Sequence, residues 1–140
     1  MAALLIIGHG PSRFNVDDDF VDSHKVCRLR RCIVDVGKNT DIICSLKRYD
    51  RWPKGIEWWN FIHGGELRKE CTRAFAGFHS GKTKPSTGLS ACLIAKYKGY
   101  EDICVTGFDW VVHPETAGSM VHDPYAENEC FKTLGITVYE

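Results

Sequence analysis

The chain has 140 residues, of which 44% are hydrophobic and 26% are charged, and its 18 lysines and arginines balance its 18 aspartates and glutamates. This composition is that of an ordinary globular domain and excludes a disordered or membrane-spanning chain. Because the formal net charge is zero, no overall field attracts nucleic acid or anionic lipid, so any anion site must be local. We expect a single compact domain over residues 1–140.

The cysteines and the N-terminus bear on location. Seven cysteines without a C-x-x-C pair cannot all form disulfides within one chain, which favours reduced thiols and disfavours structural zinc. The apolar start at 1–7 is too short for a secretory signal, and no stretch approaches the ~20 apolar residues of a spanning helix. The sequence predicts a cytoplasmic protein with no membrane partner and no metal.

Three strands are predicted in the first part of the chain. Residues 3–7 form a continuous apolar run, typical of a strand in the middle of a sheet, and lead into the glycine loop G-H-G-P-S at 8–12. Residues 24–29 alternate in polarity, and residues 40–46 read T-D-I-I-C-S-L, so both segments are predicted strands.

The middle of the chain is less regular. Residues 47–65 show no clear period and are expected to be irregular. Their tryptophans either pack in the core or line a binding surface: Trp52, Trp58 and Trp59. A helix is predicted over 66–75, where apolar side chains recur on one face.

The best-marked helix begins at 85–87 and ends at Gly99. Its predicted apolar stripe consists of Leu89, Leu93, Ile94 and Tyr97. A strand follows at 102–106. Asp123 and Pro124 then provide the N-cap and first residue of a last helix, which stops near Gly135 before a final strand at 136–139.

This order of elements predicts the fold class. Strands that alternate with helices over short connections indicate an α/β, Rossmann-like three-layer sandwich with a mostly parallel sheet. Ligands in such sheets bind beyond the carboxyl ends of the strands. We therefore expect the loops that begin at Gly8 and Gly107, and the helix start at Ser86, to share one edge.

Two glycine-containing loops resemble phosphate-binding motifs incompletely. The loop at Gly8 and Gly10 has Arg13 where a dinucleotide motif has its third glycine, so it is either backbone that a nucleotide approaches closely or a tight turn. The segment 77–83 lacks the first glycine of a P-loop, which excludes that motif.

Candidate chemistry lies in the second half of the chain. Ser86, Thr87 and Gly88 are either an ordinary N-cap or a cradle for a phosphate at a helix N-terminus. His113 and His122 flank a loop predicted to lie at the ligand edge. We interpret His122 as a general base, with Glu127 one helical turn beyond it, where the carboxylate either orients the imidazole or forms helix contacts.

Taken together, these segments resemble the sialyltransferases of glycosyltransferase family 29. The stretches I-I-G-H-G-P-S at 6–12, V-D-S-H-K-V-C-R-L-R at 21–30 and D-V-G-K-N-T-D-I-I at 35–43 are similar to the large sialylmotif. P-S-T-G at 85–88 and I-C-V-T-G-F at 103–108 are similar to the small one, and His122 with Glu127 fits the H-x4-E motif.

The resemblance implies a glycosyltransferase A-like variant of the fold and transfer of sialic acid from CMP-sialic acid to a hydroxyl of a glycan or other acceptor. Transfer inverts the anomeric centre and needs no metal or other cofactor. His122 and Glu127 are the implied catalytic pair, and His113 is expected to meet the donor phosphate. The implied donor-binding residues are Gly8, His9, Gly10, Ser12, Arg28, Arg30, Ser86, Thr87, Gly88, Gly107, Phe108 and His113.

Departures from the family pattern leave other functions open. His9 stands where the family loop has asparagine, and Arg30 replaces a second asparagine, so a different donor is one alternative. A transferase for another nucleotide sugar or for a nucleotide acceptor fits the same loops. So does a nucleotide-binding module without catalysis, because the chain is short and its third motif is degenerate.

Overall fold

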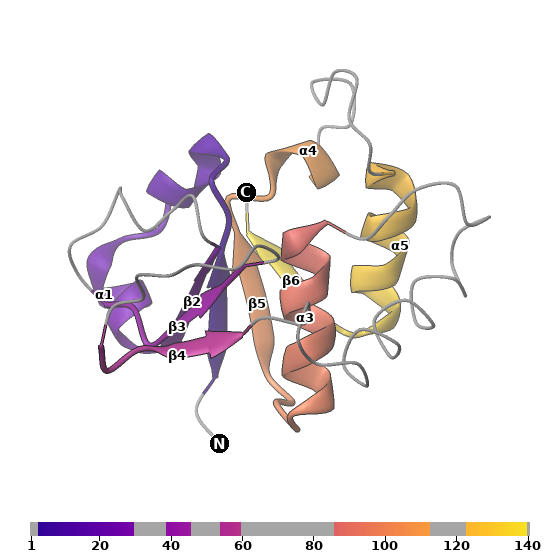
Figure 1. The fold of residues 1–140 in the computed structure, drawn as a ribbon. Helices are drawn as coiled ribbons and strands as arrows, with labels where there is room; N and C mark the ends of the chain where they lie inside the picture. The colour runs from indigo at the N-terminus through magenta and orange to yellow at the C-terminus, as the bar shows by residue number, and fades with distance from the viewer. Residues whose placement is uncertain (1–2, 30–38, 46–53, 60–85, 113–122, 140) are drawn as a thin grey trace.

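The computed structural model describes residues 3–29, 39–45, 54–59, 86–112 and 123–139 (Figure 1). Its strands are β1 (Leu4–Ile7), β2 (Lys25–Leu29), β3 (Ile42–Cys44), β4 (Glu57–Trp59), β5 (Ile103–Thr106) and β6 (Thr137–Tyr139). They form one sheet in the order β4-β3-β2-β1-β5-β6, and all neighbouring strands are parallel. The predicted α/β class and its parallel sheet are confirmed.

The order of the strands locates a topological switch point. From β1 the sheet grows outward through β2, β3 and β4, after which the chain returns to the other side of β1 and adds β5 and β6. The sheet order therefore reverses between β1 and β5, which end side by side at Ile7 and Thr106. Ligands of open α/β sheets bind beyond the strand ends at such a reversal.

Helices cover the sheet on both faces, as Figure 1 shows. α1 (Asp18–Asp22) lies on one face, where Val21 packs with Leu5, Ile7 and Val26. α3 (Thr87–Tyr97) and α5 (Pro124–Thr133) lie on the other face. The 3-10 helix at Pro11–Phe14 and the short α4 (Asp109–Val112) follow β1 and β5 at the carboxyl edge. No helix of the described residues has the length and apolarity needed to cross a membrane.

Local signals explain where α3 and α5 begin and end. Ser86 caps α3 by accepting a hydrogen bond from the Leu89 amide, and Gly99 follows the helix with φ +94°. Asp123 caps α5 by accepting from the Ala126 amide. The predicted boundaries of both helices, and the strands predicted at 102–106 and 136–139, are confirmed within two residues.

The predicted stripe of α3 is wrong at Tyr97, which is 60% exposed. Leu89, Leu93 and Ile94 are buried as expected, but so is every residue from 88 to 95, so α3 is a core helix with no single apolar stripe. Tyr97 lies in the last turn, beyond this buried stretch.

The region expected to be irregular contains β4, so that prediction is wrong at 57–59. Trp59 is buried in the large core cluster, and its ring centroid lies 5.9 Å from that of Tyr100, which supports packing for this tryptophan. Trp58 is half-buried on the same strand. Trp52 and the helix predicted over 66–75 lie outside the described residues.

Candidate functional site

Ser12 joins the loops that follow β1 and β5. Its amide donates to the Asp109 carboxylate at 3.2 Å, and its hydroxyl donates to Asp109 Oδ2 at 3.0 Å. The same hydroxyl accepts from the Gly107 amide at 3.1 Å, while Thr106 Oγ1 donates to the Ser12 carbonyl at 3.3 Å. These bonds fix the two loops to each other at the switch point.

Glycines allow the two loops to approach closely. A Cβ on Gly8 would lie 2.6 Å from the Gly107 carbonyl oxygen and 2.8 Å from Phe108 Cδ1, and one on Gly10 would overlap Asp109 Oδ2. Gly107 has φ +77°, a conformation that favours glycine. Protein atoms thus occupy the space that side chains at positions 8 and 10 would fill. A ligand could contact Gly8 and Gly10 only through their backbone atoms.

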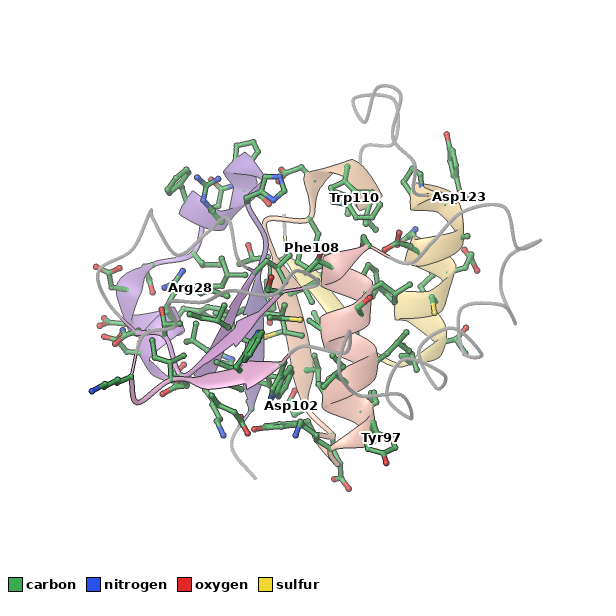
Figure 2. All side chains as sticks on the ribbon, viewed as in Figure 1. Arg28, Tyr97, Asp102, Phe108, Trp110 and Asp123 are labelled. Atoms are coloured by element: carbon green, nitrogen blue, oxygen red, sulfur yellow. The ribbon has the colours of Figure 1, made fainter. Side chains whose placement is uncertain are left out.

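Phe108 connects these loops to the helices. It is buried beside Gly8, and a Cβ on Gly88, in the first turn of α3, would overlap its ring. On its other side, Phe108 packs edge-to-face with Phe131 of α5 at 5.7 Å between ring centroids. Phe108 therefore brings the first loop, the start of α3 and α5 together at the edge where the sequence predicts a shared site (Figure 2).

Ser86 and Glu127 form the contact between the start of α3 and α5. Glu127 is fully buried, and its Oε2 accepts from the Ser86 amide at 3.3 Å, while a short hydrogen bond joins its Oε1 to Ser86 Oγ. Burial, with a smaller contribution from the nearby Asp123, raises the pKa of Glu127 to about 8 against the opposing effect of the Ser86 hydrogen bonds. The sequence left two roles open for Glu127, orientation of the His122 imidazole or contacts between helices. The structure shows the helix contact, to Ser86.

Arg13 and His9 form the outer rim of the first loop. The Arg13 guanidinium donates to the carbonyls of His9 at 2.6 Å and Gly10 at 3.0 Å and lies 4.0 Å from the centre of the Phe14 ring. The His9 side chain is exposed. A positive charge and an exposed imidazole thus stand beside the loop that ends β1.

Arg28 lies apart from the start of α3. It lies two residues after Val26 on β2 and therefore on the same face of the sheet, which is the α1 face, opposite α3 and α5 (Figure 2). Its Nε donates to Thr40 Oγ1 at 3.0 Å, and the residue is buried. The structure does not bring the Arg28 side chain together with Ser86.

Several predicted site residues fall outside the described part of the chain: Arg30, His113 and His122. Thr87 is the half-buried first residue of α3. Asp123, where the described chain resumes, caps α5 at the carboxyl edge, near Trp110 of α4 in Figure 2. Asp102 and Tyr97 mark the opposite edge in the same view.

The described residues contain no cluster of three histidine, cysteine or acidic side chains that could hold a metal ion. Cys92, Cys104 and Cys130 are buried free thiols. Burial raises the pKa of Cys104 and of Cys130 to about 11, and that of Cys92 well above its usual value. Such thiols are poor nucleophiles and poor ligands at neutral pH.

Sequence reasoning missed Asp109, which organises the site through Ser12. The available signal was an acidic residue two positions after the glycine that follows a buried strand, at the edge where ligands bind. α4 spans only four residues and shows no helical period, so the sequence predicts no element at Asp109. Arg13 stands where a dinucleotide motif has its third glycine, and no local pattern predicts its hydrogen bonds to the His9 and Gly10 carbonyls.

Comparison of the chain with protein-family models, with curated proteins and with solved structures finds no match. A functional assignment therefore depends on the site itself. The site offers the first turn of α3, where Ser86 caps the Leu89 amide but the Thr87 and Gly88 amides have no acceptor within the helix, beside two fixed loops at a switch point. Such an arrangement can bind an anionic group of a small molecule.

Proposed function

We propose that the protein is a small glycosyltransferase of the sialyltransferase type, which transfers a sugar from a CMP-activated donor to an acceptor hydroxyl with inversion. The supporting observation is the convergence of sequence-distant segments: Gly8 and Gly88 both abut Phe108, and Glu127 binds Ser86. These segments carry the resemblance to sialyltransferases. Their meeting at the switch point fits a single donor site.

The donor phosphate would lie against the first turn of α3. The amides of Thr87 and Gly88 point beyond the helix N-terminus, where the helix dipole favours negative charge. As the bond between the sugar and CMP breaks, its electron pair moves to the phosphate oxygen, and these amides stabilise the charge that develops. His113 would add to this stabilisation.

His122 is the proposed general base. It would take the proton of the acceptor hydroxyl as the oxygen attacks the anomeric carbon on the face opposite CMP. The residue that follows it, Asp123, caps α5 at the carboxyl edge, which agrees with a base near the donor. A cytoplasmic location and a glycan or other hydroxyl compound as acceptor belong to the same proposal.

Release of CMP from CMP-sialic acid tests the proposal. We expect the wild-type protein to release CMP, at least by slow hydrolysis, and His122→Ala to lower the rate by about 10²- to 10⁴-fold while CMP binding is retained. His24→Ala is the matched control, because His24 lies just before β2 at the opposite edge of the sheet and should leave the rate unchanged. Full turnover by His122→Ala would contradict the base assignment, and binding without turnover in the wild type would indicate a non-catalytic module.

A second candidate is a transferase for another nucleotide sugar or a nucleotide acceptor. The exposed His9 favours it, because this residue stands at the loop where sialyltransferases carry asparagine. Thermal-shift measurements with CMP-, UDP- and GDP-sugars separate the candidates, since a ligand at 100 times its Kd adds about 2.7 kcal/mol of stability. Preference for uridine or guanosine would favour the second candidate.

A further inference from the structure

Glu127 is a buried carboxyl group that no described cation compensates. It is fully buried, and its hydrogen bonds within the described residues come from Ser86 alone. The titratable groups around it are Cys92 on α3 and Asp123 and Cys130 on α5. α4, which also packs against α5, contributes Asp109, whose carboxylate is bound to Ser12. None of these groups would stabilise a negative charge on Glu127.

The hydrogen bonds at Ser86 can be satisfied in two ways. If Glu127 is ionised, the Ser86 hydroxyl must donate to Oε1, and its single proton is consumed. If Glu127 is protonated, its own O–H donates to Ser86 Oγ, while Oε2 still accepts from the Ser86 amide. Ser86 Oγ then accepts from both Glu127 and the Leu89 amide, so the Ser86 proton is available to another acceptor.

A second observation concerns the same side of α3. Ser90 lies one turn beyond Ser86, and its hydroxyl is fully buried with no hydrogen-bond partner among the residues that the structure describes. Buried hydroxyls in folded proteins nearly always have a partner, so the Ser90 hydroxyl is a buried donor for which the described residues supply no acceptor. When Glu127 is protonated, the hydroxyls of Ser86 and Ser90, on one side of the first turns of α3, both lack an acceptor in the described part of the chain.

We propose that Glu127 is a positioning residue that is protonated at neutral pH and donates to Ser86, which turns the Ser86 hydroxyl proton toward the phosphate of the bound donor. This inference rests on the proposed function, because the donor supplies the acceptor. Ionisation of Glu127 withdraws the hydroxyl and places a negative charge against the helix N-terminus. Phosphate binding and ionisation of Glu127 therefore exclude each other.

The pH dependence of CMP affinity tests the inference. With a pKa of about 8 for Glu127, the protonated fraction falls about 30-fold between pH 7 and pH 9.5, and the affinity of the wild type should fall by the same factor. The phosphate of CMP is already a dianion throughout this range. Glu127→Gln keeps a carbonyl for the Ser86 amide and an N–H for Ser86 Oγ, so its affinity should stay constant within about twofold.

Glu129→Gln is the matched control. Glu129 lies on the same helix, but it is exposed and paired with Lys132 at 3.3 Å, so its replacement should leave the pH profile of the wild type unchanged. A measurement on the wild type alone covers the case in which Glu127→Gln fails to fold. Calorimetry at pH 9 in buffers of different ionisation enthalpy should show uptake of about 0.9 proton for each CMP bound.

Each outcome is decisive. Parallel pH profiles for the wild type and Glu127→Gln, or no proton uptake at pH 9, would overturn the role of Glu127 in positioning. Failure of the wild type to bind CMP at any pH would overturn the proposed function. In that case, protonation of Glu127 is tested without ligand. If Glu127 is protonated in the folded protein, the free energy of unfolding of the wild type, relative to that of Glu127→Gln, decreases between pH 5 and pH 8.

Discussion

Two serine–carboxylate pairs stand at the carboxyl edge with almost the same hydrogen bonds. Asp109 accepts from the amide and hydroxyl of Ser12, and Glu127 contacts the amide and hydroxyl of Ser86. The first carboxyl is only half-buried, whereas the second is fully buried. The first pair joins two loops at the surface, while the second joins two helices in the core. Similar bonds therefore have different consequences, because water reaches the Asp109 carboxylate and does not reach the Glu127 carboxyl group.

The largest expected effect is a pH dependence of stability that comes from Glu127. The unfolded chain loses this proton near pH 4.5 and the folded protein near pH 8, so the free energy of unfolding falls as pH rises between these values. The contribution is complete below the lower pH and absent above the higher one. Its size is about 3–5 kcal/mol, at about 1.4 kcal/mol for each pKa unit.

Urea denaturation between pH 4.5 and pH 9 measures this effect as the difference between the wild type and Glu127→Gln. Asp109→Asn is the matched control for the other pair, and it should retain the slope that Glu127→Gln removes. If the difference in free energy of unfolding between the wild type and Glu127→Gln is constant with pH, Glu127 has the same pKa in the folded and unfolded states, which would contradict the prediction.

Truncation of the two carboxylate side chains to alanine should give clearly different losses of stability. Glu127→Ala leaves a cavity between α3 and α5 and an unsatisfied Ser86 amide, and we expect a loss of about 3 kcal/mol. Asp109→Ala should cost about 1 kcal/mol, because water can reach the groups that it exposes. Urea midpoints at pH 7 check both values, and equal losses would contradict the assignment of one pair to the core and the other to the surface.

The same two pairs show what the sequence could predict. Ser86 and Asp123 could be identified as caps because their partners lie three residues away. The hydrogen bond from Ser86 to Glu127 joins residues that are 41 positions apart, and no local sequence pattern predicts which carboxylate binds which serine. The prediction for Tyr97 is wrong for a related reason. A helical period predicts which face of a helix is buried, but α3 is buried on all sides from residue 88 to residue 95, and it becomes exposed only in its last turn, where Tyr97 lies.

Substitution of Gly10 should break the surface pair by steric means. Gly10 has φ −70°, which any residue adopts, so alanine introduces no backbone strain there, but its Cβ would overlap Asp109 Oδ2. Displacement of this carboxylate from Ser12 should cost about 2 kcal/mol. Gly55→Ala is the complementary control: Gly55 has φ +81° and no atom of the described residues within 4 Å of the added Cβ, so its smaller cost comes from the backbone alone. If Gly10→Ala were as stable as the wild type, the two loops would not depend on close approach.

Ser12→Ala shares with Asp109→Ala the smallest expected effect. This change removes the hydroxyl that donates to Asp109 at 3.0 Å and accepts from the Gly107 amide at 3.1 Å, while the bond from the Ser12 amide remains. Because Asp109 retains that bond and contact with water, we expect a loss of about 1 kcal/mol. Hydrogen exchange at Gly107 gives a sharper measurement, since its amide loses its acceptor and should exchange faster in Ser12→Ala but not in Ser86→Ala. Equal exchange in both variants would show that the loops after β1 and β5 are held together by the glycine contacts rather than by Ser12.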